Sequence, residues 1–292
     1  MVILDFSTSL LSVICLILIG RMNAVAVILI TMILLYGIQG AYQPSVYASI
    51  PILESKDNIM QANAVINIVS SLASLAGPVA GGMIFSFSGI LPILQTAACC
   101  FVLSAVMEIF IHIPFKHQSC TDSVFRIAYD DMRQSFDFVV KDKPAVLKTC
   151  IVFALINLIL SSCIMIGMPI IVNNRLGFES SVASRMYGYI GAAEGIGSII
   201  GGLSAGKFGN RAKCDILPKL LFFCGLTLAP IAIVLAAPVT PMTAYWVMFV
   251  SIMIMMVLAT FASIQINAYL QMITPDDIIG KVISFVSCIC ML

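Results

Sequence analysis

The chain has 292 residues, of which 61% are hydrophobic and only 10% are charged, and its mean hydropathy is +1.09. These values lie outside the range of soluble domains of this length and indicate a membrane protein. With 15 Lys and Arg residues against 14 Asp and Glu residues the net charge is +1, so the charge balance gives no indication of a nucleic-acid partner.

Apolar runs of about 20 residues, the length that crosses a bilayer, recur along the chain. Four runs precede a polar central segment, Pro114 to Lys148, four follow it, and a ninth begins near Ile279. The eight complete runs are Val2 to Ile19, Val25 to Ile50, Ile59 to Phe87, Ile90 to Ile113, Thr149 to Val172, Ser184 to Gly206, Ile216 to Ala237 and Thr243 to Met272. We therefore expect an all-α polytopic membrane protein with eight complete transmembrane helices and a partial ninth.

The polar segment divides the chain into an N-terminal bundle, residues 1–113, a central loop, residues 114–148, and a C-terminal bundle, residues 149–292. The halves echo each other, because Ser49-Ile50-Pro51 before a new helix resembles Ile273-Thr274-Pro275 before the last run. Such a parallel repeat favours a two-bundle transporter. Chance similarity between two helix pairs is the alternative.

Basic residues concentrate in the loops on one side of this alternating map. Of the 15 Lys and Arg residues, all but Arg21, Arg175 and Arg185 fall on the side that holds the central loop. Because basic loops stay in the cytoplasm, we expect the N-terminus and the central loop to be cytoplasmic. Within that loop, apolar residues from Phe125 to Val139 at helical spacing predict a short amphipathic helix, lying either on the membrane surface or in solvent.

A first motif lies in the third run. Ala73 to Gly82 reads Ala-Ser-Leu-Ala-Gly-Pro-Val-Ala-Gly-Gly and is similar to the antiporter motif GxxxGPxxGG of the major facilitator superfamily, with Gly77, Pro78, Gly81 and Gly82 matched. Glycines at this spacing permit close approach of a neighbouring helix, and a proline removes one backbone donor and bends the helix. Simple helix packing is the alternative role of these residues.

A second motif follows the sixth run. Gly202 to Arg211 reads Gly-Leu-Ser-Ala-Gly-Lys-Phe-Gly-Asn-Arg and resembles the family's cytoplasmic loop signature GxxxDRxGRR, with Gly202, Lys207, Gly209 and Arg211 matched. Gly206 replaces the aspartate of the signature, which puts the family's ion-pair latch in doubt. Lys207 and Arg211 are then expected to interact with the preceding helix dipole and with lipid phosphates.

The resemblance covers the whole chain, as the family's third helix to the start of its eleventh, so the sequence looks like a fragment. Pro44, Ile50-Pro51, Gln61-Ala62-Asn63 and Gly77-Pro78 resemble the drug or macrolide-efflux and siderophore-exporter branch. The family implies a secondary transporter with a small-molecule substrate, a lipid bilayer and a proton or other ion gradient as partners, and no cofactor or metal. The expected function is proton-coupled export by alternating access in a bacterial plasma membrane. A truncated, non-transporting remnant is the first alternative. A membrane-embedded transferase is the second, although the sequence shows no catalytic constellation and we expect no enzyme.

The resemblance also places the substrate cavity on the second, fifth and eighth runs. Polar residues on these runs are expected there, with interhelical hydrogen bonding as the alternative role. The candidates are Tyr36, Gln39, Gln43 and Tyr47, which share one helix face, with Asn157, Ser161, Gln265 and Asn267.

Glu194 lies near the middle of the sixth run, between Gly191 and Gly195. An acid at this depth costs about 3 kcal/mol on insertion scales, so it needs a partner, water or a bound proton. Glu194 is therefore the candidate for proton coupling, and a hydrogen-bonded packing residue is the alternative. Asp5 and Glu108 lie near helix ends and are expected to reach the membrane interface.

Overall fold

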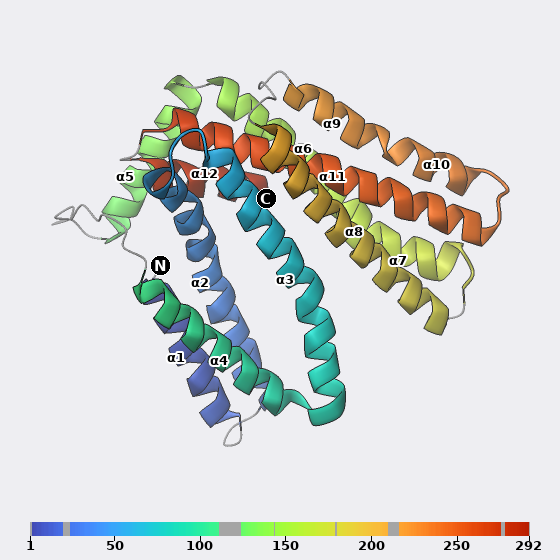
Figure 1. Cartoon of the computed structure of the whole chain (residues 1–292), viewed down its shortest axis with the longest axis horizontal. Helices are drawn as coiled ribbons and strands as arrows, with labels where there is room; N and C mark the ends of the chain where they lie inside the picture. Colours follow the sequence, from blue (N-terminus) through green and yellow to red (C-terminus); the bar gives the residue numbers. More distant parts are fainter. Residues whose placement is uncertain are drawn as a thin grey trace. The chain divides into compact units, whose positions relative to one another are not determined.

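The structure is a computed structural model of the whole chain, and the parts that it describes are helices joined by short connections (Figure 1). The described residues are 2–19, 24–110, 124–142, 144–178, 180–209, 216–275 and 278–291. In lipid every backbone polar group must be satisfied within the chain, and a helix satisfies its own groups, so these apolar runs become helices.

The first half contains four long helices and the predicted amphipathic helix of the central loop. They are α1 (Val2–Leu18), α2 (Ala24–Leu53), α3 (Ile59–Ser88), α4 (Ile90–Ile109) and α5 (Val124–Asp137), which continues as the π-helical turn η1 (Phe138–Asp142). Gly89 separates α3 from α4 with a φ of 76°, a backbone conformation that glycine adopts without strain.

The second half begins with a helical rod that contains two π-helical turns. It consists of α6 (Pro144–Ser162), η2 (Cys163–Gly167), α7 (Met168–Ile170) and η3 (Ile171–Arg175), and is followed by α8 (Ser180–Phe208), α9 (Leu217–Leu226), α10 (Leu228–Ala236), α11 (Pro241–Ile273) and α12 (Ile279–Met291). Helix α11 starts sharply because Pro241 occupies its first turn and the Thr240 hydroxyl accepts from the Thr243 backbone N–H at 3.3 Å.

Six helices are long and apolar enough to cross a membrane within the described residues. These spans are Val25–Leu53, Ile59–Gly81, Ile90–Ile109, Ile151–Ile170, Leu217–Ala236 and Pro241–Ile273. Helix α1 is a shorter apolar helix, and α8 is long enough but contains many glycines, which lower its hydropathy. The prediction of an all-α polytopic membrane protein is confirmed.

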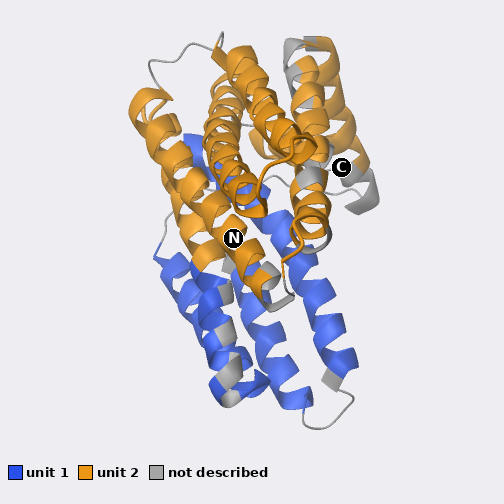
Figure 2. Cartoon of the chain, turned by 90° about the vertical axis from the view of Figure 1, so that its right-hand side faces the viewer, with its two compact units in different colours: residues 1–53, 76–127 blue, residues 54–75, 128–292 orange. Residues whose placement is uncertain are grey.

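The chain divides into two compact units (Figure 2). Unit 1 contains residues 1–53 and 76–127, and unit 2 contains residues 54–75 and 128–292. The first part of α3 therefore belongs to unit 2 and its second part to unit 1. The division into bundles at residues 113 and 149 stays a prediction, because it describes membrane topology and these units describe contacts.

Unit 2 has its main core between α8 and α11. Tyr245, Met248 and Ile252 of α11 are fully buried against Ile190 of α8 and Val172 of η3. A second core joins the central loop to the end of the chain, where Phe138 and Val139 pack with residues of α11 and α12. In unit 1, α1 packs mainly on α4 and also on α2 (Figure 1).

Candidate functional site

Three helices of unit 2 meet along a seam of polar side chains. Ser198 of α8 is at its centre, since its hydroxyl lies 2.7 Å from Ser71 Oγ of α3 and accepts from Thr260 Oγ1 of α11 at 3.1 Å. It also donates weakly to Asn67 Oδ1 of α3 at 3.4 Å. Hydroxyl and amide groups away from water need such partners, so this seam fixes how α3, α8 and α11 face one another.

Glycines on α8 permit the close approach at this seam. A Cβ built on Gly201 would lie 2.6 Å from the Val257 backbone oxygen of α11, and one on Gly202 would lie 2.8 Å from Ile68 Cγ1 of α3. A Cβ built on Gly209, directly after α8, would lie 2.6 Å from Met60 Cγ of α3. Two glycines of the second motif therefore lie in tight helix contacts. Lys207 is exposed, with its ammonium 5.5 Å from the Phe208 ring, and Arg211 lies outside the described residues.

The glycines of the first motif have a different environment in the structure. A Cβ built on Gly77 or Gly81 meets no atom within 4 Å. The side-chain surroundings of Pro78 and Gly82 lie outside the described part of the structure. Close helix approach at this motif therefore stays a prediction.

Glu194 is half-buried on α8, one helical turn before Ser198. Residues four apart lie on one helix face, so the carboxyl group and the polar seam share a side of α8. The neighbouring Gly195 faces Leu75 of α3 so closely that a Cβ there would overlap the leucine side chain. This places the acid beside the α3 and α8 contact.

The predicted cavity stripe on α2 lies in unit 1. Tyr36 is 70% exposed and Gln39 is exposed, while Gln43 and Tyr47 are half-buried. All four are in the span Val25–Leu53, whose surroundings would otherwise be apolar. Tyr36 and Gln39 are thus not covered by other residues of unit 1.

The other cavity candidates lie in unit 2 and have mixed environments. Asn157 is half-buried and Ser161 is exposed on α6, whereas Gln265 is buried and Asn267 is half-buried on α11. Near these residues, Leu160 of α6 and Met255 of α11 belong to one apolar cluster with Cys224 of α9. The role of the four polar candidates in a cavity stays a prediction.

Sequence reasoning missed an acid cluster in unit 1. Asp5 and Glu108 lie near the ends of α1 and α4 and are each only 7% exposed, so both are covered by other parts of unit 1, and their position at the membrane interface stays a prediction. Ser104 Oγ donates to Asp5 Oδ2 at 2.6 Å, and the Tyr42 hydroxyl donates to Glu108 Oε1 at 2.9 Å. The signal in the sequence was the spacing of four between Ser104 and Glu108, which puts two polar groups on one face of an apolar helix.

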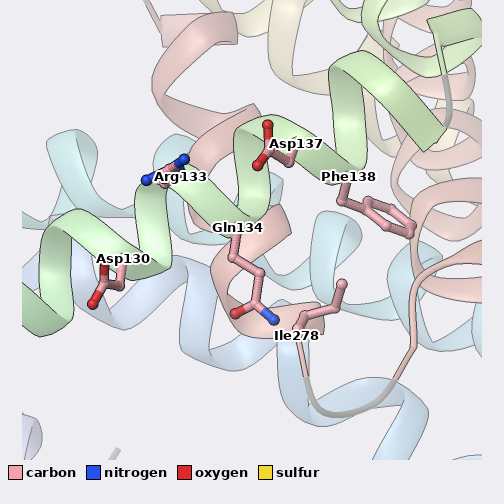
Figure 3. Close-up of a pocket in the computed structure, with 6 residues that line it drawn as sticks. All are labelled: Asp130, Arg133, Gln134, Asp137, Phe138 and Ile278. Carbon is pink, nitrogen blue, oxygen red and sulfur yellow. The ribbon is translucent and has the colours of Figure 1, made fainter.

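A surface pocket lies where the central loop meets the last helix (Figure 3). It is lined by Asp130, Arg133, Gln134, Asp137, Phe138 and Ile278. Beside it, Lys281 Nζ lies 2.8 Å from Asp131 Oδ1 and donates to Gln134 Oε1 at 3.0 Å. This charged contact between α5 and α12 belongs to the loop and not to the predicted cavity.

The fold and these polar groups define a polytopic helical protein of the transporter class. Residues 3–292 match the Major Facilitator Superfamily, so the chain belongs to this family. Its fold is similar to the crystal structure of a bacterial homologue of the iron transporter ferroportin in its outward-facing state, with a TM-score of 0.69 and 14% sequence identity. That match covers 99% of this chain and 71% of the other chain. No curated protein sequence matches the chain significantly.

Proposed function

We propose that the protein is a proton-coupled exporter of small amphiphilic molecules, with the N-terminus and residues 114–148 in the cytoplasm of a bacterial cell. Family membership supports movement of small molecules across a membrane. The proposed topology rests on the one-sided distribution of basic residues.

The polar stripe of α2 carries the substrate part of the proposal. Tyr36 and Gln39 are exposed in a strongly apolar span, where phenol and amide groups facing lipid would be costly. In a cavity that holds amphiphilic substrates, these side chains would not face lipid. The phenol ring would pack on apolar groups of the substrate, and the hydroxyl and amide groups would bind its polar groups. The resemblance of Pro44 and of Gly77-Pro78 to the efflux branch agrees with this substrate class.

Glu194 carries the coupling part of the proposal. Its carboxyl group is half-buried one turn from the seam that joins α3, α8 and α11. A proton taken up there neutralises a charge beside a helix contact, and so changes the relative stability of two arrangements of these helices. This is the change that alternating access requires.

The test is dye transport by the protein in inside-out membrane vesicles. With an imposed proton gradient we expect accumulation of an amphiphilic fluorescent cation such as ethidium, and its loss when an ionophore removes the gradient. Glu194→Gln should abolish gradient-driven accumulation, and Tyr36→Ala should reduce it by about tenfold, the loss of roughly 1.4 kcal/mol of binding. The matched control is Glu54→Gln, an exposed acid outside the helices. Gradient-driven transport unchanged in Glu194→Gln would refute the coupling role, and a wild-type protein without transport would refute the exporter.

A further inference from the structure

A stripe of apolar residues with a period of four runs along the helical rod that begins with α6 and ends after η3. All of its members are buried or half-buried, and they are Ile156, Leu160, Ile164, Met168, Val172 and Leu176. In a regular α-helix a step of four residues exceeds a full turn by about 40°, so five such steps carry a stripe about 200° around the helix. A regular α-helix would therefore turn one end of this stripe away from the core.

The two π-helical turns of the rod keep the stripe on one side. A π turn holds about one residue more than an α turn, because its hydrogen bonds join residues five apart, and one residue of an α-helix corresponds to about 100°. The turns η2 and η3 together thus offset about 200°, which is the drift of the stripe. At the end of η3 the Leu176 N–H donates to the Ile171 carbonyl oxygen at 3.0 Å, which is the hydrogen bond of a π turn.

The sequence Gly167-Met168-Pro169 explains the position of η2. Proline has no backbone N–H, so Pro169 cannot donate to the carbonyl oxygen of Met165, four residues back, and the α-helical pattern is interrupted at this turn. A Cβ built on Gly167 meets no atom within 4 Å. Met165 and Ile166 are 74% and 64% exposed, so their side chains do not hold the turn in one form.

The rod is anchored more firmly after η2 than before it. After η2, Met168 and Val172 are 3% and 0% exposed in the core between α8 and α11. Before η2, Leu160 lies in a smaller cluster with Cys224 of α9 and Met255 of α11. Lipid chains are as apolar as leucine, so little free energy opposes the release of Leu160 from that cluster into lipid. If the rod turns at η2, α6 is therefore the part that moves.

We propose that η2 is a rotary joint, a π turn that closes to an α turn and so rotates α6 by about 100° about its axis relative to α7 and η3. Asn157 and Ser161 are four residues apart on α6 and turn with it. This polar pair then faces one direction while η2 is a π turn and another while it is an α turn. Because the pair is part of the predicted cavity, the joint rests on the proposed function, in which it presents the pair to the substrate in one state of the cycle only.

Deletion of Ile166 tests the joint, because a π turn that loses one residue becomes an α turn. The deletion places Ile164, Met168 and Val172 three and four residues apart, the spacing of one face of an α-helix. We expect the unfolding temperature in detergent to stay within about 3 °C of the wild type. The control is deletion of Ile254, which is also exposed but lies in α11, α-helical throughout its length. Half of α11 then turns by about 100° against its core, so the unfolding temperature should fall by at least about 10 °C.

Photo-cross-linking of the purified full chain in lipid bilayers shows whether α6 turns. With p-benzoylphenylalanine in place of Ser161, we expect two sets of cross-linked peptides by mass spectrometry, and one set once Ile166 is deleted. Pro169→Ala restores the missing backbone N–H without a deletion, and should also leave one set. The control is the same probe in place of Ile170, an exposed residue of α7 beyond the joint, which should give one set in every variant.

Dye transport separates the joint from the exporter proposal. Where the wild type transports, deletion of Ile166 should abolish transport although the protein stays folded. The joint would be overturned by transport in this variant, by an unfolding temperature as low as that of the Ile254 deletion, or by identical cross-links from position 161 with and without Ile166. A wild-type protein that does not transport would refute the exporter, and the cross-links would still decide whether α6 turns.

Discussion

Asn63 of α3 and Gln271 of α11 form a reciprocal pair of amide hydrogen bonds inside unit 2. Asn63 Nδ2 donates to Gln271 Oε1 at 2.5 Å, and Gln271 Nε2 lies 3.5 Å from Asn63 Oδ1. The two side chains are 1% and 3% exposed and are 208 positions apart in the sequence. This pair, with the Ser198 seam, fixes the rotation of α3 against α11.

Removing one side of the amide pair should destabilise unit 2. Asn63→Ala leaves buried polar atoms of Gln271 without this partner, so we expect a loss of about 1–3 kcal/mol, near the lower end if lipid or water relaxes around it. Thermal unfolding of the purified protein in detergent measures this loss. Asn58→Ala is the control, because Asn58 is exposed and bonds only weakly to Glu54 at 3.2 Å. Equal unfolding temperatures for the two variants would contradict a structural role of the pair.

The tight contact between α8 and α11 predicts opposite effects for two glycines of one helix. Gly201→Ala should destabilise by about 1–3 kcal/mol, since the new Cβ would lie 2.6 Å from the Val257 backbone oxygen, which cannot rotate away. Gly191→Ala adds a Cβ that meets nothing within 4 Å, and should be neutral or stabilise by up to about 1 kcal/mol through helix propensity. Unfolding in detergent compares them directly. Tolerance of alanine at Gly201 would show that the helices are not in contact there.

The amphipathic helix of the central loop should be held by apolar burial and not by its ion pair. Val139 is fully buried with residues of α11 and α12, so Val139→Ala should cost about 2 kcal/mol. Lys281→Ala removes the partly exposed pair with Asp131, which is worth about 0–1 kcal/mol. Hydrogen exchange of residues 124–142 should therefore rise much more in Val139→Ala. The reverse order would mean that charge, and not packing, holds the loop.

The spans and the family were predictable from the sequence because their signals are local. A helix that crosses a bilayer needs about 20 apolar residues, and its backbone hydrogen bonds form within the helix. Each helix can therefore be recognised from the residues of its own run. The helix boundaries differ from the predicted runs by a few residues, because α4 ends at Ile109 where Ile113 was predicted and α11 extends to Ile273 where Met272 was predicted. Hydropathy alone does not identify the sixth run as a membrane span. Helix α8 is long, but it contains glycines that pack against other helices and lower its hydropathy.

The polar partnerships were decided by the tertiary structure alone. Tyr42 meets Glu108 across 66 positions, Ser104 meets Asp5 across 99, and Asn63 meets Gln271 across 208. Helical spacing tells which residues share a face of one helix, but the partner of that face depends on the rotation and register of another helix, which no local pattern records. For this reason the sequence by itself determined the helices, their family and the position of Glu194 within an apolar run, whereas only packing showed that Asp5 and Glu108 are both buried.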